Sequence, residues 1–224
     1  MIKDFDLLQR ANNDYTTIDL EHAEELAYRE LIDSIRYISL GDECGVMGNI
    51  ANIITYKGRF YIQEEQFDRV FIYDDTGRCL KKIDNKGRGP GEYLRIESID
   101  INTEKEELML VDGMSDKLFF YDLDGNFKSI HSIRYFQTEN TLCLRDSVFL
   151  HISAPSQNFG NEGLYGYALV LSKGNENFLK GYRYLPLQVG YKGGGQIFKG
   201  YERSCYHPIY SDTIYQILSD TTYG

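Results

Sequence analysis

The 224-residue chain has no tryptophan, only 4 prolines and few basic residues relative to acidic ones. Its 34 acidic and 24 basic residues give a formal net charge of −10. A nucleic-acid backbone or an anionic membrane requires a basic face, so neither is expected as the main partner. No segment approaches the roughly 18 consecutive apolar residues of a membrane helix, so we predict no transmembrane segment.

A signal peptide is also missing from the sequence, because MIKDFDLLQRANND lacks an apolar stretch and a small-residue cleavage site. We therefore expect either a cytoplasmic protein or a sequence that begins after a removed signal. The four cysteines are far apart, with no C-x-x-C pair and no histidine at ligand spacing, which argues against zinc. They are Cys44, Cys79, Cys143 and Cys205. We expect isolated thiols partly buried in strands. A disulfide between distant strands is the alternative, since spacing does not reveal connectivity.

What the chain has in abundance is tyrosine, phenylalanine and glycine, at 19, 12 and 21 residues. Hydrophobic residues make up 42 % of the chain, which excludes wholesale disorder. Aromatic residues favour strands, and the length fits one domain with a sizeable core. The composition therefore predicts β structure.

An internal repeat indicates which β architecture to expect. Residues 67–77 (FDRVFIYDDTG) match residues 115–125 (SDKLFFYDLDG), with every matched pair, such as Gly77 and Gly125, 48 positions apart. The sequence DTIY begins at residue 212, which lies three repeats of 48 positions after Asp68, and its first residue matches Asp68. A unit of four short antiparallel strands recurring every 40 to 50 residues is the signature of a β-propeller blade.

Glycine and aspartate turns separate the expected strands. We predict strands at 50–56, 59–64, 69–73 and 79–83, then 95–101, 107–112, 117–122 and 127–133, and, less regularly, 138–144, 147–153, 166–172 and 178–184. The blades then cover about 49–84, 95–133, 135–185 and 196–224 within a propeller of residues 41–224, and the fourth lacks its outermost strand. Residues 1–40 form a separate N-terminal segment. Apolar spacing there predicts a short helix after Asp19, and alternation predicts a strand over Ser34–Leu40 that would close a ring.

The runs IDSIRYISLGDE, FIYDDTGRCLKKIDNKGRGPGEYLRIESIDI and LMLVDGMSDKLFFYDLDGNFKSI resemble the six-bladed β-propeller domains of bacterial cell-envelope lipoproteins. These domains are distant relatives of NHL repeats, and their function is largely uncharacterised. The most specific piece is G-R-G-P-G-E-Y at residues 87–93, and DTIYQI resembles a strand of the family. The resemblance covers about residues 15–218. It implies a cell-envelope location, in the periplasm or on the outer-membrane surface, and a ring of six blades. Since the length suits about four, we expect an incomplete six-bladed ring; a closed four-bladed ring is the alternative.

The G-R-G-P-G-E-Y segment is the main candidate binding site. A phosphate loop is disfavoured, because Pro90 removes an N–H donor and a strand rather than a helix follows. A tight turn between blades is the structural interpretation. Loops of this kind lie on the propeller rim, so the functional interpretation is a ligand-binding face. We predict that it consists of Arg88, Glu92, Tyr93 and Arg95.

Other polar residues favour structural roles. Asp68, Asp116 and Asp212 recur at one position of the blade, which is typical of a turn cap. Asp100 and Glu97 lie near an inner strand, where a metal site would need further ligands from other blades. The comparable residues there are Asn49, Asn52, Glu139 and Asn140. The four histidines form no H-E-x-x-H motif, and no G-x-S-x-G elbow is present. We predict no catalytic residues, no metal site and no cofactor.

The leading hypothesis is therefore a non-enzymatic β-propeller that binds a carbohydrate, a peptide or a protein of the cell envelope. The alternative is a metal-dependent propeller hydrolase, lactonase or lyase, which would need three or more oxygen or histidine ligands converging on the propeller axis.

Overall fold

The fold is all-β throughout the part of the chain that the structure describes. The computed structural model describes residues 32–133, 138, 140–145, 148–152, 166–174, 177–184, 195–199, 204–207 and 214–217. These residues contain fifteen strands and no helix, and therefore no helix long and apolar enough to span a membrane. The expected helix after Asp19 lies outside the described residues.

Four antiparallel sheets follow one another along the chain, and each keeps its strands in sequence order. Blade 1 consists of β1 (Ile50–Tyr56), β2 (Arg59–Glu64), β3 (Arg69–Asp74) and β4 (Cys79–Ile83). Blade 2 consists of β5 (Ser98–Asn102), β6 (Glu107–Asp112), β7 (Lys117–Asp122) and β8 (Phe127–Ser132). Blade 3 consists of β9 (Asn140–Arg145), β10 (Val148–Ile152), β11 (Tyr167–Lys173) and β12 (Asn177–Tyr184). The fourth sheet has three described strands, β13 (Gln196–Lys199), β14 (Ser204–His207) and β15 (Tyr215–Ile217).

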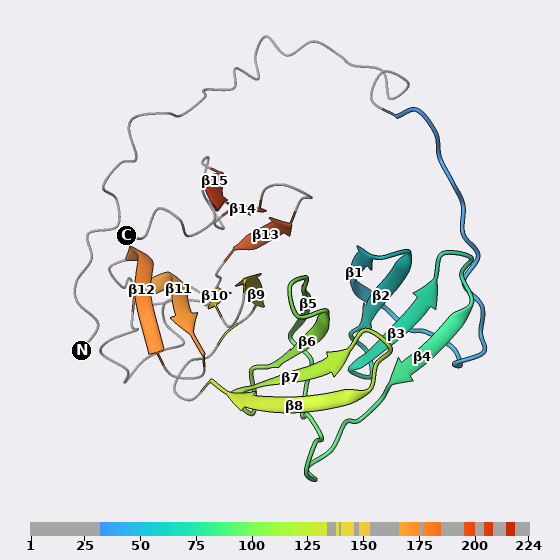
Figure 1. The fold of residues 1–224 in the computed structure, drawn as a ribbon, viewed down its shortest axis with the longest axis horizontal. Coiled ribbons are helices and arrows are strands. Elements are labelled where there is room, and N and C mark those ends of the chain that lie inside the picture. The colour runs from blue at the N-terminus through green and yellow to red at the C-terminus, as the bar shows by residue number, and fades with distance from the viewer. Residues whose placement is uncertain are drawn as a thin grey trace.

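The sheets are arranged like the blades of a propeller (Figure 1). The first strand of each sheet lies toward the centre of the view, and β4, β8 and β12 lie at the periphery. The described blades form an arc rather than a closed ring, with blade 1 at one end and β13–β15 at the other. The predicted propeller architecture is thus confirmed in its blades, while a ring of six blades is not shown.

Apolar side chains between neighbouring blades make the core. Tyr61, Val70 and Ile72 of blade 1 pack against Leu108, Leu110, Phe119 and Tyr121 of blade 2. The opposite face of blade 2 packs on blade 3, and blade 3 in turn packs on Tyr206 of the fourth sheet. Side chains alternate between the two faces of a strand, so each blade contributes one face to each neighbour.

The repeat corresponds to repeated turns. Asp74 ends β3, and its carboxylate accepts hydrogen bonds from the N–H groups of Thr76 and Arg78, both at 3.0 Å. Asp122, the equivalent residue 48 positions later, accepts from Asp124 and Asn126 at 3.0 and 2.8 Å. Gly77 and Gly125 have φ of 88° and 80°, a conformation that glycine adopts without strain. Aspartate and glycine therefore recur because the same turn recurs.

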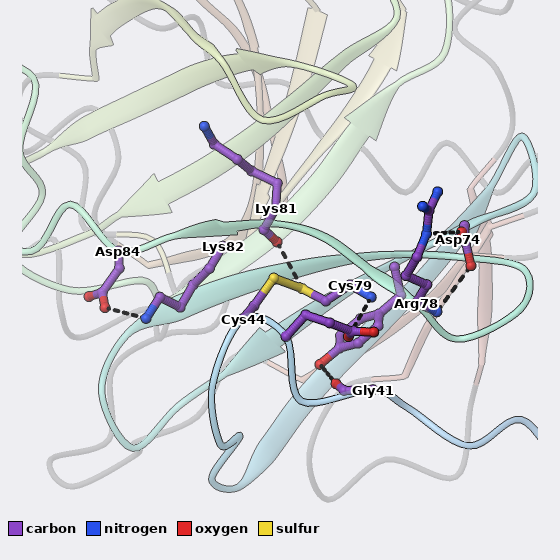
Figure 2. The surroundings of a disulfide bond; sticks show 10 residues. Gly41, Cys44, Asp74, Arg78, Cys79, Lys81, Lys82 and Asp84 are labelled. Carbon is purple, nitrogen blue, oxygen red and sulfur yellow. Dashed lines mark hydrogen bonds and ion pairs between the residues drawn. A yellow bond between two sulfur atoms is a disulfide. The ribbon is translucent and has the colours of Figure 1, made fainter.

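The segment before blade 1 differs from the prediction. Residues 34–40 form no strand, although their alternation predicts one. Residues 36–47, here called the strap, lie instead along the outer part of blade 1 (Figures 1 and 2). The Gly41 N–H donates to the Gly77 carbonyl at 2.8 Å. The Tyr73 hydroxyl donates to the Gly41 carbonyl at 3.2 Å.

A disulfide attaches the strap to β4. Cys44 and Cys79 are bonded, with Cα atoms 6.0 Å apart (Figure 2). The expectation of isolated thiols is therefore wrong for this pair and holds for Cys143 and Cys205, which are free. Sequence spacing could not reveal the pairing, because 35 residues separate the two cysteines and only the path of the strap brings them together.

Candidate functional site

The candidate site is the connection between β4 and β5, residues 84–97, which projects beyond the blades at the bottom of Figure 1. Its two arms are hydrogen-bonded to each other. The Gly87 N–H donates to the Tyr93 carbonyl at 2.9 Å, and the Tyr93 N–H donates to the Asn85 carbonyl at 3.1 Å. These bonds close residues 85–93 into a loop with a defined backbone, here called the rim loop.

Glu92 points back into the rim loop. Its Oε2 accepts a hydrogen bond from the Gly89 N–H at 2.7 Å, and the Glu92 N–H donates to the Gly89 carbonyl at 3.1 Å. A Cβ atom on Gly87 would lie 1.9 Å from Glu92 Oε2, so any larger residue there would push this carboxylate aside. Gly91 has a φ of 83°. The glycines of the G-R-G-P-G-E-Y motif thus leave space for a carboxylate that folds back onto the loop, and they allow the turn.

Tyr93 anchors the rim loop in the core. Its side chain is fully buried, and its ring meets Phe119 of blade 2 edge-on, with centroids 5.9 Å apart. The hydroxyl donates to the Asp68 carbonyl at 2.9 Å and accepts from the Asn85 N–H at 3.1 Å. Burial raises the pKa of this phenol, so Tyr93 stays neutral over the whole physiological range.

The two arginines of the predicted site are placed differently. Arg95 is paired with Glu97, its Nε lying 3.4 Å from Oε1. Arg88 is exposed at the tip of the rim loop, and no hydrogen bond or ion pair joins it to another described residue. Of the four predicted residues, Glu92 and Tyr93 therefore shape the loop, and Arg88 is the exposed one that no described residue engages.

Asp68 connects the β2–β3 turn to this region. Its Oδ1 accepts a hydrogen bond from the Ile96 N–H at 3.1 Å, and its Oδ2 is paired with Lys86. It has a φ of 56°, and Asp116, its counterpart in blade 2, has a φ of 53°. Burial and the neighbouring Asp112 raise the pKa of Asp116. Both aspartates lie in turns, but the turn amides bond to Glu64 and Asp112 instead, and the Asp68 carboxylate bonds to the β4–β5 connection. The predicted role as a turn cap is therefore wrong for Asp68, and Asp212 lies outside the described residues.

The carboxylates considered for a metal site are used within the protein. Asp100 is buried on β5, and its Oδ2 accepts a hydrogen bond from the Cys143 N–H of blade 3 at 2.8 Å. Glu97 is paired with Arg95, and Glu139 lies outside the described residues. Among the residues that are described, no three histidine, cysteine, aspartate or glutamate side chains form a group that could hold a metal ion.

Comparison with known proteins connects this geometry to a family. Residues 15–223 match a domain of unknown function, DUF4934. The chain belongs to the DUF4934 family. No curated protein matches the chain.

Among solved structures, this DUF4934 chain is similar to a Bacteroides fragilis protein described as exported, with a TM-score of 0.72 and 18 % identity. The match covers 83 % of this chain and 52 % of the other, so the chain spans about half the length of that relative. BamB of Moraxella catarrhalis matches with a TM-score of 0.40 and 12 % identity, and the match covers 74 % of this chain and 44 % of BamB. The β-propeller domain of Swd1 from Myceliophteria thermophila matches with a TM-score of 0.39 and 13 % identity. This match covers 70 % of this chain and 53 % of the Swd1 chain.

Proposed function

We propose that this DUF4934 protein is a non-enzymatic binding module of the bacterial cell envelope, and that the rim loop is part of its binding surface. The observation that carries the proposal is the state of Arg88. Hydrogen bonds and a buried tyrosine hold the loop around it, while its own guanidinium has no partner among the described residues. Because the backbone of the loop is already ordered, binding at Arg88 needs no ordering of the backbone, and only the arginine side chain loses conformational freedom.

The chemistry of arginine suggests the class of ligand. A guanidinium presents a planar set of N–H donors that matches a carboxylate, phosphate or sulfate group. Within the classes proposed from the sequence, this favours an acidic carbohydrate or an acidic peptide segment, including one on an envelope protein. Arg95 lies near the base of the loop and contributes further positive charge, partly offset by Glu97.

The envelope location is supported by the disulfide. Disulfides persist in oxidising compartments such as the bacterial periplasm and are rare in the cytosol. The Cys44–Cys79 bond therefore fits the location that the resemblance to six-bladed envelope lipoproteins implies. The membership of this chain in such a lipoprotein group, with six blades in the whole protein, is part of the same proposal.

Binding to an array of acidic and neutral glycans and to a library of acidic peptides tests the function. We expect binding to anionic members of one of these sets, weakened about tenfold or more by Arg88→Ala, which corresponds to about 1.4 kcal/mol. Arg78→Ala is the matched control, because Arg78 is an exposed arginine on the separate β3–β4 turn. Binding that persists in EDTA separates this function from that of a metal-dependent hydrolase, lactonase or lyase. No binding to either set, or equal binding by Arg88→Ala, would contradict the proposal.

A further inference from the structure

The connection between β4 and β5 carries as many acidic as basic side chains. Residues 84–97 contain three of each, namely Asp84, Glu92 and Glu97, and Lys86, Arg88 and Arg95. The segment that bears the proposed binding surface therefore has no net charge. It offers no extended basic surface to a ligand with many adjacent negative charges.

Ion pairs account for four of these six charges. The pairs are Asp84–Lys82 and Arg95–Glu97, each at 3.4 Å, and Lys86–Asp68. Arg88 and Glu92 remain, and neither forms an ion pair with a described residue, including the other. The charges available to a ligand are therefore one guanidinium and one carboxylate.

These two groups project from the same short stretch of backbone. Arg88 lies between Gly87 and Gly89, and both glycines face the Glu92 carboxylate. A Cβ would lie 1.9 Å from Glu92 Oε2 on Gly87, and 3.1 Å from it on Gly89. The Gly89 N–H also donates to this oxygen at 2.7 Å. The loop thus fixes the carboxylate beside the residue that carries the guanidinium.

Glu92 uses only one of its two carboxylate oxygens within the protein. Its Oε2 accepts the hydrogen bond from Gly89, whereas no described residue donates to Oε1, and the residue is exposed. Each carboxylate oxygen has two acceptor sites. The rim loop therefore presents a hydrogen-bond acceptor on Glu92 next to the N–H donors of Arg88.

The side chains of this segment favour a carbohydrate over a peptide. Protein and peptide partners gain most of their affinity from large apolar or aromatic anchors. No large apolar side chain of residues 84–97 is exposed, and the one aromatic residue there, Tyr93, is buried. An acidic peptide segment would also bring further carboxylates close to Glu92, and like charges repel each other.

A sugar acid has the complementary groups within one ring. Its carboxylate matches the guanidinium of Arg88. Its hydroxyls are O–H donors, which is what the free oxygen of Glu92 accepts. Because each unit carries a single negative charge, the groups beside its carboxylate are neutral, and Glu92 does not repel them.

We propose that the rim loop binds a carbohydrate that contains uronic acid units, and that Glu92 determines this specificity. The sugar carboxylate binds the Arg88 guanidinium, and a neighbouring hydroxyl donates a hydrogen bond to Glu92 Oε1. This assignment rests on the binding function proposed above and narrows its ligand to one class. Glu92 then has two roles, since Oε2 shapes the loop and Oε1 contacts the sugar.

Calorimetric titration of the full chain tests this proposal. The probes are trisaccharides of galacturonate and of glucuronate, the same trisaccharides with their carboxylates reduced, and a triglutamate peptide. We expect wild type to bind at least one uronate more tightly than its reduced form and than triglutamate. These comparisons test the ligand class without any variant.

Glu92→Gln tests the role of the carboxylate. The amide oxygen can still accept from Gly89, but the group that faces the ligand becomes an N–H donor. We expect the uronate affinity to fall about tenfold, because a hydrogen bond to a charged acceptor is lost. Asp75→Asn is the matched control, since Asp75 is an exposed acid on the separate β3–β4 turn, and it should bind like wild type. Hydrogen exchange at the Gly89 amide verifies that the loop of Glu92→Gln is intact.

The outcomes separate this inference from the function on which it rests. Tighter binding of triglutamate than of both uronates would overturn the inference and leave the binding function standing. Equal uronate affinity in wild type and in Glu92→Gln would do the same. If wild type bound no glycan and no acidic peptide, the proposed function would fail, and this inference with it.

Discussion

Gly87 leaves space for a neighbouring side chain in the rim loop. The Glu92 carboxylate occupies the space that a Cβ at residue 87 would need. We therefore expect Gly87→Ala to displace the exposed Glu92 carboxylate and break its hydrogen bond to Gly89, which should destabilise the protein by about 0.5–1.5 kcal/mol. Urea unfolding measures the loss, and hydrogen exchange at the Gly89 amide shows whether the loop has opened.

Arg88→Ala is the control for that experiment, because Arg88 makes no hydrogen bond or ion pair with a described residue. Its free energy of unfolding should stay within about 0.5 kcal/mol of wild type. An unchanged urea midpoint for Gly87→Ala would show that the loop accommodates the methyl group and that its rigidity is not as described.

His151 predicts a dependence of stability on pH. It is buried on β10 between the hydroxyls of Thr141 and Ser172, at 3.0 and 2.8 Å, and burial lowers its pKa from 6.5 to about 3. Below pH 6.5, His151 therefore binds a proton in the unfolded chain but stays neutral in the folded chain until the pH nears 3. The free energy of unfolding should fall as pH drops from 6.5 towards 3, by up to about 1.4 kcal/mol per pH unit from this group.

Denaturant titrations at a series of pH values measure that slope. In His151→Gln the slope over this range should be smaller, although the variant is less stable at neutral pH. Part of the slope should remain, because burial also lowers the pKa of His131. An identical slope in His151→Gln and wild type would be inconsistent with a neutral buried histidine.

At the scale of elements, the strands of blades 1 and 2 were predictable. Alternation and turn residues place β1, β2, β4, β6 and β7 at the predicted bounds, and β3 and β8 within one residue. The reason is that the strands are short and their turns are marked locally by aspartate and glycine. The strand predicted at 95–101 begins three residues late, at Ser98, because Arg95 to Glu97 still belong to the connection from blade 1.

What the sequence did not predict depends on contacts between distant residues. Residues 34–40 alternate like a strand, but pairing requires a neighbouring edge, and none is present among the described residues. The hydrogen bond from Gly89 to the Glu92 carboxylate depends on the fold of the loop, and the burial of Tyr93 depends on blade 2. Local sequence therefore identified the rim loop as special without showing which of its side chains reach solvent.

The disulfide gives a prediction about the strap. Replacing both Cys44 and Cys79 with serine should destabilise the protein by about 2–4 kcal/mol, because the unfolded chain is no longer cross-linked. Thermal unfolding with and without a reducing agent measures the effect. The reducing agent should lower the midpoint of wild type and leave that of the double variant unchanged.

A Cys143→Ser variant serves as the control, because Cys143 is a free thiol. It should respond to the reducing agent as wild type does. A thiol titration of the denatured, unreduced protein should find two free cysteines, and four would contradict the Cys44–Cys79 bond.

At the scale of the whole molecule, the blades depend on their neighbours. Both faces of blade 2 are packed against other blades, and Asp100 adds a hydrogen bond across to Cys143 of blade 3. Blade 1 has a blade on one side and the strap on the other. Stability should therefore be greatest inside the arc and lower at its ends, as in other stacked repeats.

Hydrogen exchange followed by mass spectrometry measures this gradient. We expect the slowest exchange in β6 and β7, and faster exchange in β13–β15 and in β1, where Ile50 and Ile53 are half exposed. Uniform exchange across the blades would indicate that they unfold as one cooperative unit.

The glycine turn that each blade presents to its neighbour also bears on how such a chain changes over generations. Gly77 and Gly125 meet their partners in the same way, one against the strap and one against a blade. A tandem duplication of one repeat would carry its own turn and its own receiving strand, so the contact at this turn would form again in the new copy.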